Sequence, residues 1–169
     1  MLDRARKVPS RSGNQQTGKI ATARRGRADR RRPAEQSSKD LALAIADIGL
    51  DKKALNVEII DVGDKSDYAD YVVVMSGRSD RQVRAIADHL LREMSQEHGA
   101  RCMGVEGLPH GFWVLMDYGD IIVHVFYEET RNFYDLEGLW LDAKRITSKR
   151  LVDYAQNTEP FDGEEIVID

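Results

Sequence analysis

The chain has 169 residues, of which 41% are hydrophobic and 32% are charged, and its formal net charge at pH 7 is −4. This length suits one domain with additional segments, and the hydrophobic content is enough for a core, which excludes a wholly disordered chain. No stretch approaches the roughly 20 consecutive apolar residues that a membrane-spanning helix requires, so a membrane-spanning protein is also excluded.

The charge is distributed unevenly along the chain. Residues 1–38 hold 11 basic and three acidic residues, a net of +8, whereas residues 39–169 hold 14 basic and 26 acidic residues, a net of −12. Because the first segment has few large aliphatic side chains, we expect a disordered basic arm whose arginines can neutralise the phosphates of a nucleic acid. A solvated extension and an organelle transit peptide are the alternatives. Residues 151–169 hold six acidic and no basic residues, which predicts a solvated acidic tail.

The cysteine and histidine content bears on metal and redox chemistry. Cys102 is the one cysteine, so no internal disulfide can form, and the four histidines are scattered without the paired spacing of zinc ligands. We therefore expect neither a metal nor a cofactor, and a reducing, cytoplasmic compartment fits best.

The globular body, predicted over 39–150, begins with a helix and two strands. Either Ser37 or Ser38 can cap the helix, and apolar residues then recur at helical spacing at Leu41, Ala44, Ile45 and Ile48. Residues 56–62 (NVEIIDV) have the composition of a strand. Residues 71–75 (YVVVM) form a continuous apolar run, which is typical of a strand covered on both faces.

A second helix follows, and its start and end are well marked. Ser79 and Gln82 have the spacing of a capping box, in which each side chain accepts from a backbone amide of the first turn. Gly99 supplies a C-terminal stop. The apolar positions between them lie on one face of a helix: Val83, Ile86, Ala87, Leu90, Leu91 and Met94.

The last third of the body predicts strands and then short helices. Residues 101–106 suggest a third strand, and residues 111–117 and 120–127 suggest a hairpin that turns at Tyr118 and Gly119. The predicted fold is therefore α/β, with a mixed sheet of about five strands and helices packed on it.

Two features could belong to an enzyme that uses nucleotides. Gly77 follows a buried strand and precedes a capped helix, so the turn could bind a phosphate, although its spacing matches neither a P-loop nor a Rossmann motif. A tight, well-capped turn is the simpler interpretation. Asp117 and Asp120 could hold metal ions in a nucleotidyltransferase, but a turn separates them, which favours roles in the turn and at the strand start.

His124 and Cys102 are weaker catalytic candidates. His124 lies within a predicted strand and could act as a base or metal ligand, but no serine or cysteine nucleophile is placed near it by any motif. A packed histidine with one satisfied nitrogen is the simpler interpretation. Cys102 is better explained as a buried residue of an apolar strand than as a nucleophile.

The hairpin offers a more productive hypothesis. Strand alternation makes both of its faces apolar, with Trp113 and Leu115 on one face and Val114 and Met116 on the other. If helices cover only one face, the other carries an exposed hydrophobic patch centred on Trp113, which would mark a protein interface. The alternative is that the terminal helices bury both faces.

Five segments of the body resemble the ribosomal silencing factor family, also called iojap-like, in order and in spacing. They are DYVVV at 70–74, SDRQVRAIAD at 79–88, VEG at 105–107, WVLMDYGDIIVHVF at 113–126 and FYDLEGLW at 133–140. The similarity extends from about residue 41 to residue 141 and does not cover the basic arm or the acidic tail.

The resemblance implies a translation regulator that is not an enzyme. Members bind a protein of the large ribosomal subunit, the one numbered fourteen, and block subunit joining when nutrients are short, while organellar relatives act in ribosome assembly. The family's fold is similar to that of nucleotidyltransferases without the catalytic carboxylates, and members are often dimeric, so a monomer–homodimer equilibrium is expected. A body with net charge −12 also suits a basic protein partner.

These expectations place the interface on the hairpin and on the segment that follows it. The predicted partner-binding residues are Trp113, Leu115, Tyr118, Asp120, Tyr134, Leu139 and Trp140. The rival hypothesis from another class is a nucleotide-binding enzyme at the Gly77 turn, and a third is an RNA-binding protein that acts through its arm.

Overall fold

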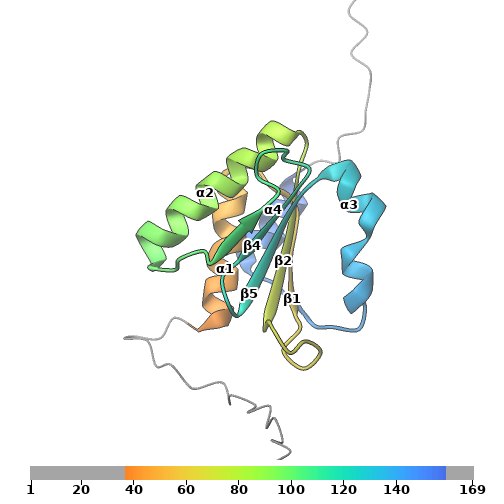
Figure 1. Cartoon of the computed structure of the whole chain (residues 1–169). Coiled ribbons are helices and arrows are strands. Elements are labelled where there is room, and N and C mark those ends of the chain that lie inside the picture. The colour runs from red at the N-terminus through yellow and green to blue at the C-terminus, as the bar shows by residue number, and fades with distance from the viewer. Residues whose placement is uncertain (1–36, 159–169) are drawn as a thin grey trace, which may run out of the picture. The chain divides into compact units, whose positions relative to one another are not determined.

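The computed structural model describes residues 37–158 (Figure 1). The predictions for the basic arm concern residues that lie almost entirely outside this range, and residues 159–169 of the predicted acidic tail also lie outside it. The described residues form four α-helices, one 3-10 helix and six strands in the order α1 (Ser38–Asp51), β1 (Leu55–Asp61), β2 (Tyr71–Gly77), α2 (Asp80–His98), β3 (Gly104–Glu106), β4 (Trp113–Asp117), β5 (Ile121–Tyr127), α3 (Glu128–Tyr134), η1 (Leu136–Trp140), β6 (Arg145–Ile146) and α4 (Lys149–Asn157).

The strands form one mixed sheet in the order β3-β4-β5-β2-β1-β6. The central pair β2 and β5 is parallel, and every other pair is antiparallel. Helices α1 and α2 cover one face of the sheet and α3 lies on the other (Figure 1). The predicted α/β class and mixed sheet are confirmed, with one strand more than the predicted five.

The face under α1 and α2, called here the helical face, holds the larger core. Ser37 caps helix α1, since its hydroxyl accepts from the Asp40 amide while the Asp40 side chain accepts from the Ser37 amide. Helix α2 ends at Gly99, which has the left-handed conformation (φ 59°) that glycine adopts easily. The predicted apolar stripe of α2 is buried at Val83, Ile86, Ala87, Leu90 and Met94, whereas Leu91 is half-buried.

The opposite face, called here the aromatic face, holds a smaller core. Its buried residues are Ile60, Val62, Ala69, Val72, Val74, Phe126 and Ala143, with Trp113, Ile122, Leu136 and Trp140 packed against them. The residues that cover it come from α3, η1 and the following turn. Because these elements are short, this face is covered by far fewer residues than the helical face.

The Gln82 side chain makes a different contact from the predicted one. Ser79 caps α2 as expected, by accepting from the Gln82 amide at 3.1 Å. The Gln82 side-chain oxygen, however, accepts from the Arg78 amide at 2.7 Å and not from the cap residue itself. Its nitrogen donates to the carbonyl oxygens of Lys52 and Lys53. One amide side chain therefore ties the end of α1 to the start of α2.

Three further elements differ from the predictions. The third strand begins at Gly104 instead of residue 101, because the chain joins β4 only from Met103, whose amide donates to Asp117. Strand β6 pairs with Ile59 and Ile60 alone, and two residues are too few to give a periodic signal. Helix α4 crosses residue 150, where the acidic tail was expected to begin, and Leu151 is buried against the core.

Candidate functional site

The hairpin of β4 and β5 has the predicted alternation. Val114 and Met116 are buried on the helical face, whereas Trp113 and Leu115 are half-buried on the aromatic face. The hairpin turns at Gly119, which has φ 86°, and the Tyr118 amide donates to the Ile121 carbonyl. The predicted split of the hairpin into two apolar faces is confirmed.

Trp113 is the centre of a ring of aromatic contacts and is not an isolated exposed side chain. Its indole stacks on Phe126 with ring centroids 4.8 Å apart, and Tyr134 of α3 lies 4.9 Å from it. The indole N–H donates to Nδ1 of His124 at 3.0 Å. Trp113 is half-buried because α3 folds back over it, so this part of the hairpin fits the alternative in which terminal helices cover both faces.

His124 is a packed residue of this cluster, as the simpler interpretation proposed. Its side chain is only 6% exposed, and burial lowers its pKa to about 4, because the charged imidazolium would lose its hydration. Since Nδ1 accepts from Trp113, the proton of the neutral ring sits on Nε2. The ring therefore serves as a neutral hydrogen-bond acceptor at neutral pH.

The exposed part of the aromatic face lies on α3 and η1. Tyr134 is 54% exposed and Leu139 is 70% exposed, while Trp140 is half-buried against the smaller core. Phe133 is also exposed and meets Tyr134 edge to face, with ring centroids 5.1 Å apart. Exposed aromatic and aliphatic side chains on two consecutive short helices form a surface suited to a protein partner.

Arg131 holds this surface in place, and sequence analysis missed it. The side chain is buried, and it donates to the Glu137 carboxylate of η1 at 2.5 Å, to Ser76 Oγ at 2.9 Å and to the Asn56 carbonyl at 2.7 Å. Asn56 lies in a bulge of β1 with φ 47°. One guanidinium thus links α3, η1 and the ends of β1 and β2. Its partners are as many as 75 residues away in the sequence, so no local motif predicts its role.

Two predicted interface residues lie apart from this surface. Tyr118 packs with the core of the helical face, its hydroxyl lies 3.5 Å from the Leu90 carbonyl, and burial raises its pKa. Asp120 is exposed at the far end of the hairpin, where its carboxylate accepts from Ser38 Oγ at 3.3 Å and its carbonyl accepts from the Asp70 and Tyr71 amides. The structure thus brings Trp113 and Tyr134 together, places Leu139 and Trp140 on η1 beside them, and leaves the turn residues separate.

The Gly77 turn and the two aspartates have structural roles. A side chain at Gly77 would lie 3.0 Å from Val83, and the Arg78 amide that could bind a phosphate already donates to Gln82. Asp117 accepts from the Gly119 amide at 2.8 Å, as a turn former does. Among residues 37–158, no group of three potential metal ligands is present. The geometry favours the tight-turn interpretation.

Cys102 is half-buried in the loop before β3. Its thiol donates to the Gly104 carbonyl at 3.1 Å, and burial raises its pKa. A thiol with a raised pKa is mostly protonated at neutral pH and is a poor nucleophile. The prediction that Cys102 is buried within a strand is wrong, because β3 begins only at Gly104, but its contacts favour a structural residue over a nucleophile.

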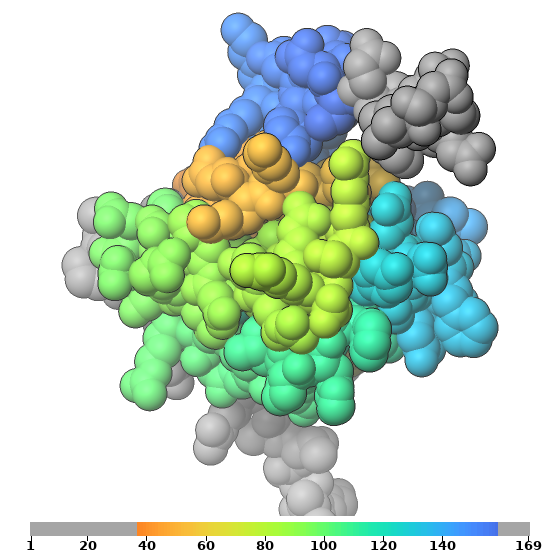
Figure 2. Space-filling model, turned by 90° about the horizontal axis from the view of Figure 1, so that it is seen from above, coloured from red at the N-terminus to blue at the C-terminus, as the bar shows by residue number. Residues whose placement is uncertain are grey.

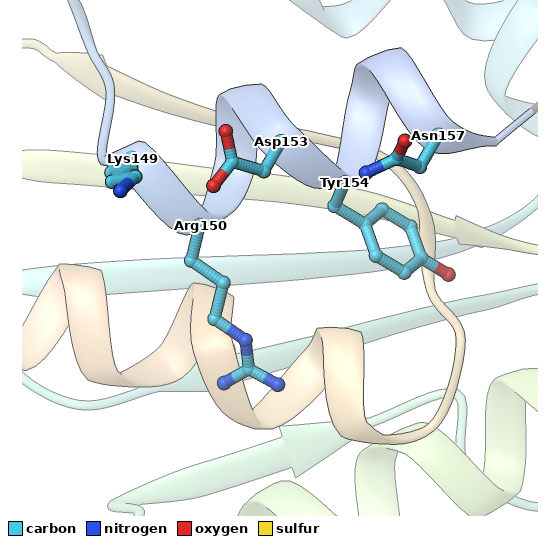
Figure 3. A pocket seen from close by; sticks show the side chains of 5 residues that line it. All are labelled: Lys149, Arg150, Asp153, Tyr154 and Asn157. Atoms are coloured by element: carbon cyan, nitrogen blue, oxygen red, sulfur yellow. The ribbon is translucent and has the colours of Figure 1, made fainter.

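An open groove lies away from the aromatic face. It has a volume of about 520 Å³ and is lined by α4 residues alone: Lys149, Arg150, Asp153, Tyr154 and Asn157 (Figure 3). Figure 3 shows Arg150 extending from α4 toward α1, where it pairs with Asp51 and Asp47. This groove is a consequence of how α4 is pinned to α1 and contains no cluster of reactive groups among its lining residues.

Comparison with known proteins identifies the family. The family model described as "Ribosomal silencing factor during starvation" matches residues 35–165. A Zymomonas mobilis protein named "Ribosomal silencing factor RsfS" is 47% identical over 90 residues, which are 53% of this chain and 67% of that protein. The mouse "Mitochondrial assembly of ribosomal large subunit protein 1" is 32% identical over 114 residues, which are 66% of this chain and 49% of that protein.

A solved structure agrees with the family match. A crystal structure of a Bacillus halodurans protein aligns with a TM-score of 0.57 and 34% identity, covering 65% of this chain and 99% of that one. No helix among residues 37–158 is long and apolar enough to cross a membrane. Since the family model covers more than three quarters of the sequence, including every described element, the chain belongs to the ribosomal silencing factor family.

Proposed function

We propose that this protein binds the large ribosomal subunit through the ribosomal protein numbered fourteen, blocks subunit joining and represses translation when nutrients are limited. The observation that carries the proposal is the exposed apolar surface of α3 and η1, in a chain whose family is named for ribosomal silencing. The mechanism is steric, because a bound domain on the joining surface leaves no room for the small subunit. No bond is made or broken, so the protein acts without being an enzyme.

The docking surface includes the exposed side chains of Tyr134 and Leu139. Trp113 contacts Tyr134, and Trp140 packs against the smaller core. Interface anchors of this kind work best when they are rigid before binding, since less conformational entropy is then lost. The stack on Trp113 and the Arg131 contacts supply that rigidity. Leu115 lies in the same strand as Trp113, whereas the predicted contacts Tyr118 and Asp120 lie apart from this surface, at the hairpin turn.

Charge supports a basic partner. The segment from residue 39 onward has a net charge of −12, which repels bare RNA on average and attracts a basic ribosomal protein. The proposal also keeps the basic arm of 1–38 as an RNA contact, the domain of 39–150 as the docking unit and the acidic residues after it as a tail. The site of action is the cytoplasm, and the protein exchanges between monomer and homodimer.

A second role, in assembly of the large subunit, is favoured by one comparison. The mouse relative is named for mitochondrial assembly of the ribosomal large subunit, and it is similar to 66% of this chain. The same surface could serve both roles, because a factor that binds the joining face of an immature subunit also keeps the small subunit away. The two roles differ in which particles the protein accompanies in cells.

The proposal is tested by sedimentation of the purified protein with separated ribosomal subunits, followed by a subunit-joining assay. We expect the parent protein to accompany large subunits and to reduce joining. Leu139→Ser and Tyr134→Ala should weaken binding by about 1–2 kcal/mol each, a factor of roughly 5 to 30, because exposed anchors are removed without loss of the fold. Tyr68→Ala is the matched control, since Tyr68 is also exposed but lies in the loop between β1 and β2.

Two results would contradict the proposal. The first is a parent protein that binds large subunits no better than small subunits. The second is equal subunit binding by the parent and by the Tyr134→Ala and Leu139→Ser variants, which would move the interface to another surface. Titration with magnesium and nucleoside triphosphates tests the rival enzyme, for which heat of binding would be expected at the Gly77 turn.

A further inference from the structure

The described part of this acidic chain has one end where cations gather. Lys52 and Lys53 follow α1, and Arg78 and Arg81 flank the start of α2, and all four are exposed. Among residues 37–158, Lys52, Lys53 and Arg81 make no ion pair. In Figure 2 the segment around residue 80 lies directly between the end of α1 and the start of α3.

Gln82 explains why these cations lie together. Its amide nitrogen donates to the carbonyl oxygens of Lys52 and Lys53 at 3.3 and 3.0 Å, and its oxygen accepts from the Arg78 amide at 2.7 Å. Lys53 has the left-handed conformation (φ 59°), which these bonds help to hold. One side chain therefore fixes the backbone of both turns, and the cationic side chains project from a rigid base.

Two of the carboxylates near Lys52, Lys53 and Arg81 are paired with other cations. Asp51 is bound to Arg150 at 2.5 Å, and Asp80 is bound to Arg84 at 3.1 Å. Glu128 and Glu129 follow Tyr127, whose backbone pairs with Gly77, so acidic residues border the cations on the side of α3. The basic end is thus a bounded patch and not a general property of the surface.

We propose that Lys52, Lys53, Arg78 and Arg81 form a second contact surface, which binds the phosphate backbone of ribosomal RNA. Long, hydrated cationic side chains on a common base suit an extended row of phosphates, whereas a small phosphate ligand would need backbone amides directed at it. The Arg78 amide is already used by Gln82. The patch therefore selects a polyanion over a single nucleotide.

The patch lies at the end of the sheet where β5 leads into α3, the element that carries the aromatic surface. A protein docked through α3 and η1 would hold its basic end at the border of that contact, where ribosomal RNA surrounds the ribosomal proteins. Naming ribosomal RNA as the polyanion rests on the proposed function. The phosphate contact itself can be measured without any ribosome.

The experiment uses the full chain and a fluorescently labelled RNA hairpin, with binding measured by anisotropy from 50 to 300 mM salt. The test variant is K52Q/K53Q/R81Q. The matched control is K39Q/R101Q/K144Q, which removes the same charge from exposed residues that also lack ion pairs with described residues. Both variants keep the basic arm, so its contribution is common to them.

We expect the test variant to bind RNA at least roughly tenfold more weakly than the parent at low salt. Its slope of log K against log salt should be smaller than the parent's by about 2, since each phosphate that the protein no longer neutralises removes near 0.7–0.9 from the slope. The control should change much less. Equal reductions in both variants, or none in either, would overturn the patch. So would a test variant that no longer binds anionic phosphatidylglycerol vesicles, or ATP, while its RNA binding is unchanged.

The outcome separates this inference from the proposed function. In one outcome, the parent protein accompanies large subunits, but the test variant and the control have the same salt slope for RNA binding. This result would leave the docking proposal intact and reject the RNA-binding patch. A selective loss of RNA binding by the test variant, together with a parent that fails to bind large subunits, would support a phosphate-binding patch and reject the ribosomal assignment.

Discussion

On the helical face of the sheet, α1 and α2 bury a continuous aliphatic layer, whereas on the aromatic face a helix of seven residues and a short 3-10 helix cover a smaller cluster. The first face is stabilised mainly by the burial of apolar surface, since one side of a 14-residue helix and one side of a 19-residue helix are removed from water there. The second depends on a few specific contacts, among them the bond from Trp113 to His124 and the buried guanidinium of Arg131.

This difference indicates that the helical face mainly stabilises the fold and that the aromatic face is available to a partner. A face buried by long amphipathic helices has little left to offer a partner, whereas a face covered by short elements leaves Tyr134 and Leu139 exposed. Polar contacts beneath that cover cost desolvation, but they specify one arrangement of the exposed side chains. We therefore expect substitutions on the helical face to affect folding first, and substitutions on the aromatic face to separate folding from binding.

The largest effect is expected from the helical face. Leu90→Ala removes a fully buried side chain from α2 and should lower the free energy of unfolding by about 3–4 kcal/mol, through reduced burial and the cavity left behind. Urea denaturation followed by circular dichroism measures it. The matched change Leu91→Ala, one residue further along but half-buried, should cost about 1 kcal/mol. Similar decreases at both positions would show that α2 does not pack by the stripe described.

A slightly smaller effect is expected from the polar centre of the aromatic face. Arg131→Met should lower the free energy of unfolding by about 3 kcal/mol, because Glu137 would be left without its buried partner and the Asn56 carbonyl without a donor. Arg84→Met breaks an exposed pair with Asp80 and should cost at most about 0.5 kcal/mol. If urea denaturation showed the same loss of stability for Arg131→Met and Arg84→Met, the buried contacts of Arg131 would stabilise the fold no more than an exposed ion pair does.

Much of the helical face could be predicted from the sequence, because the signals there are local. The cap at Ser79, the stripe from Val83 to Met94 and the stop at Gly99 all lie within one helix. Strand β2 was evident as a run of apolar residues, but its parallel pairing with β5 is a contact between distant segments and has no local signal. The two-residue β6 and the burial of Leu151 in α4 depend on tertiary packing in the same way.

The aromatic face was predicted only in part, for a related reason. Alternation placed Trp113 and His124 on the same face, so their contact could have been anticipated from the hairpin turn. The folding of α3 over Trp113 could not, since nothing near Tyr134 shows which side of the sheet the chain will return to. Arg131 was missed because its partners Asn56, Ser76 and Glu137 come from three separate elements.

The buried His124 should make the stability of the chain depend on pH. Its pKa is about 4 in the folded chain and about 6.5 when exposed, so between these values the unfolded state binds the extra proton. This contribution to stability is complete above pH 6.5, falls as the pH falls toward 4, and amounts to about 2–3 kcal/mol. Urea denaturation at pH 7 and pH 4.5 should show it as a difference between the parent and His124→Asn.

The asparagine variant keeps a polar side chain but lacks the titration, so its stability should depend less on pH over this range. Other groups contribute equally to both proteins and cancel in the difference. Identical pH dependence in the parent and the variant would mean that His124 is not buried as a neutral ring.

A smaller effect should follow from removing only the hydrogen bond beneath the surface. Trp113→Phe keeps an aromatic ring against Phe126 and Tyr134 but leaves His124 Nδ1 without its donor, so it should cost about 1–2 kcal/mol of stability. The pKa of His124 should rise, because the free Nδ1 can now take up a proton. Nuclear magnetic resonance titration of the imidazole measures it, and an unchanged pKa would exclude Trp113 as the partner that keeps the ring neutral.

The smallest effect on stability should come from the exposed end of the same face. Phe133→Ser removes a side chain that is 81% exposed in the folded chain, so the free energy of unfolding should change by no more than about 0.5 kcal/mol. Phe133 nevertheless meets Tyr134 edge to face, so its removal should reduce binding to large subunits by a factor of about 3 to 10. Val152→Ser, an exposed aliphatic position on α4, should alter neither quantity. If Phe133→Ser lowered the stability of the fold as strongly as it weakened binding, Phe133 would be part of the core. The helical face could then no longer be contrasted, as the face that stabilises the fold, with an aromatic face that binds the partner.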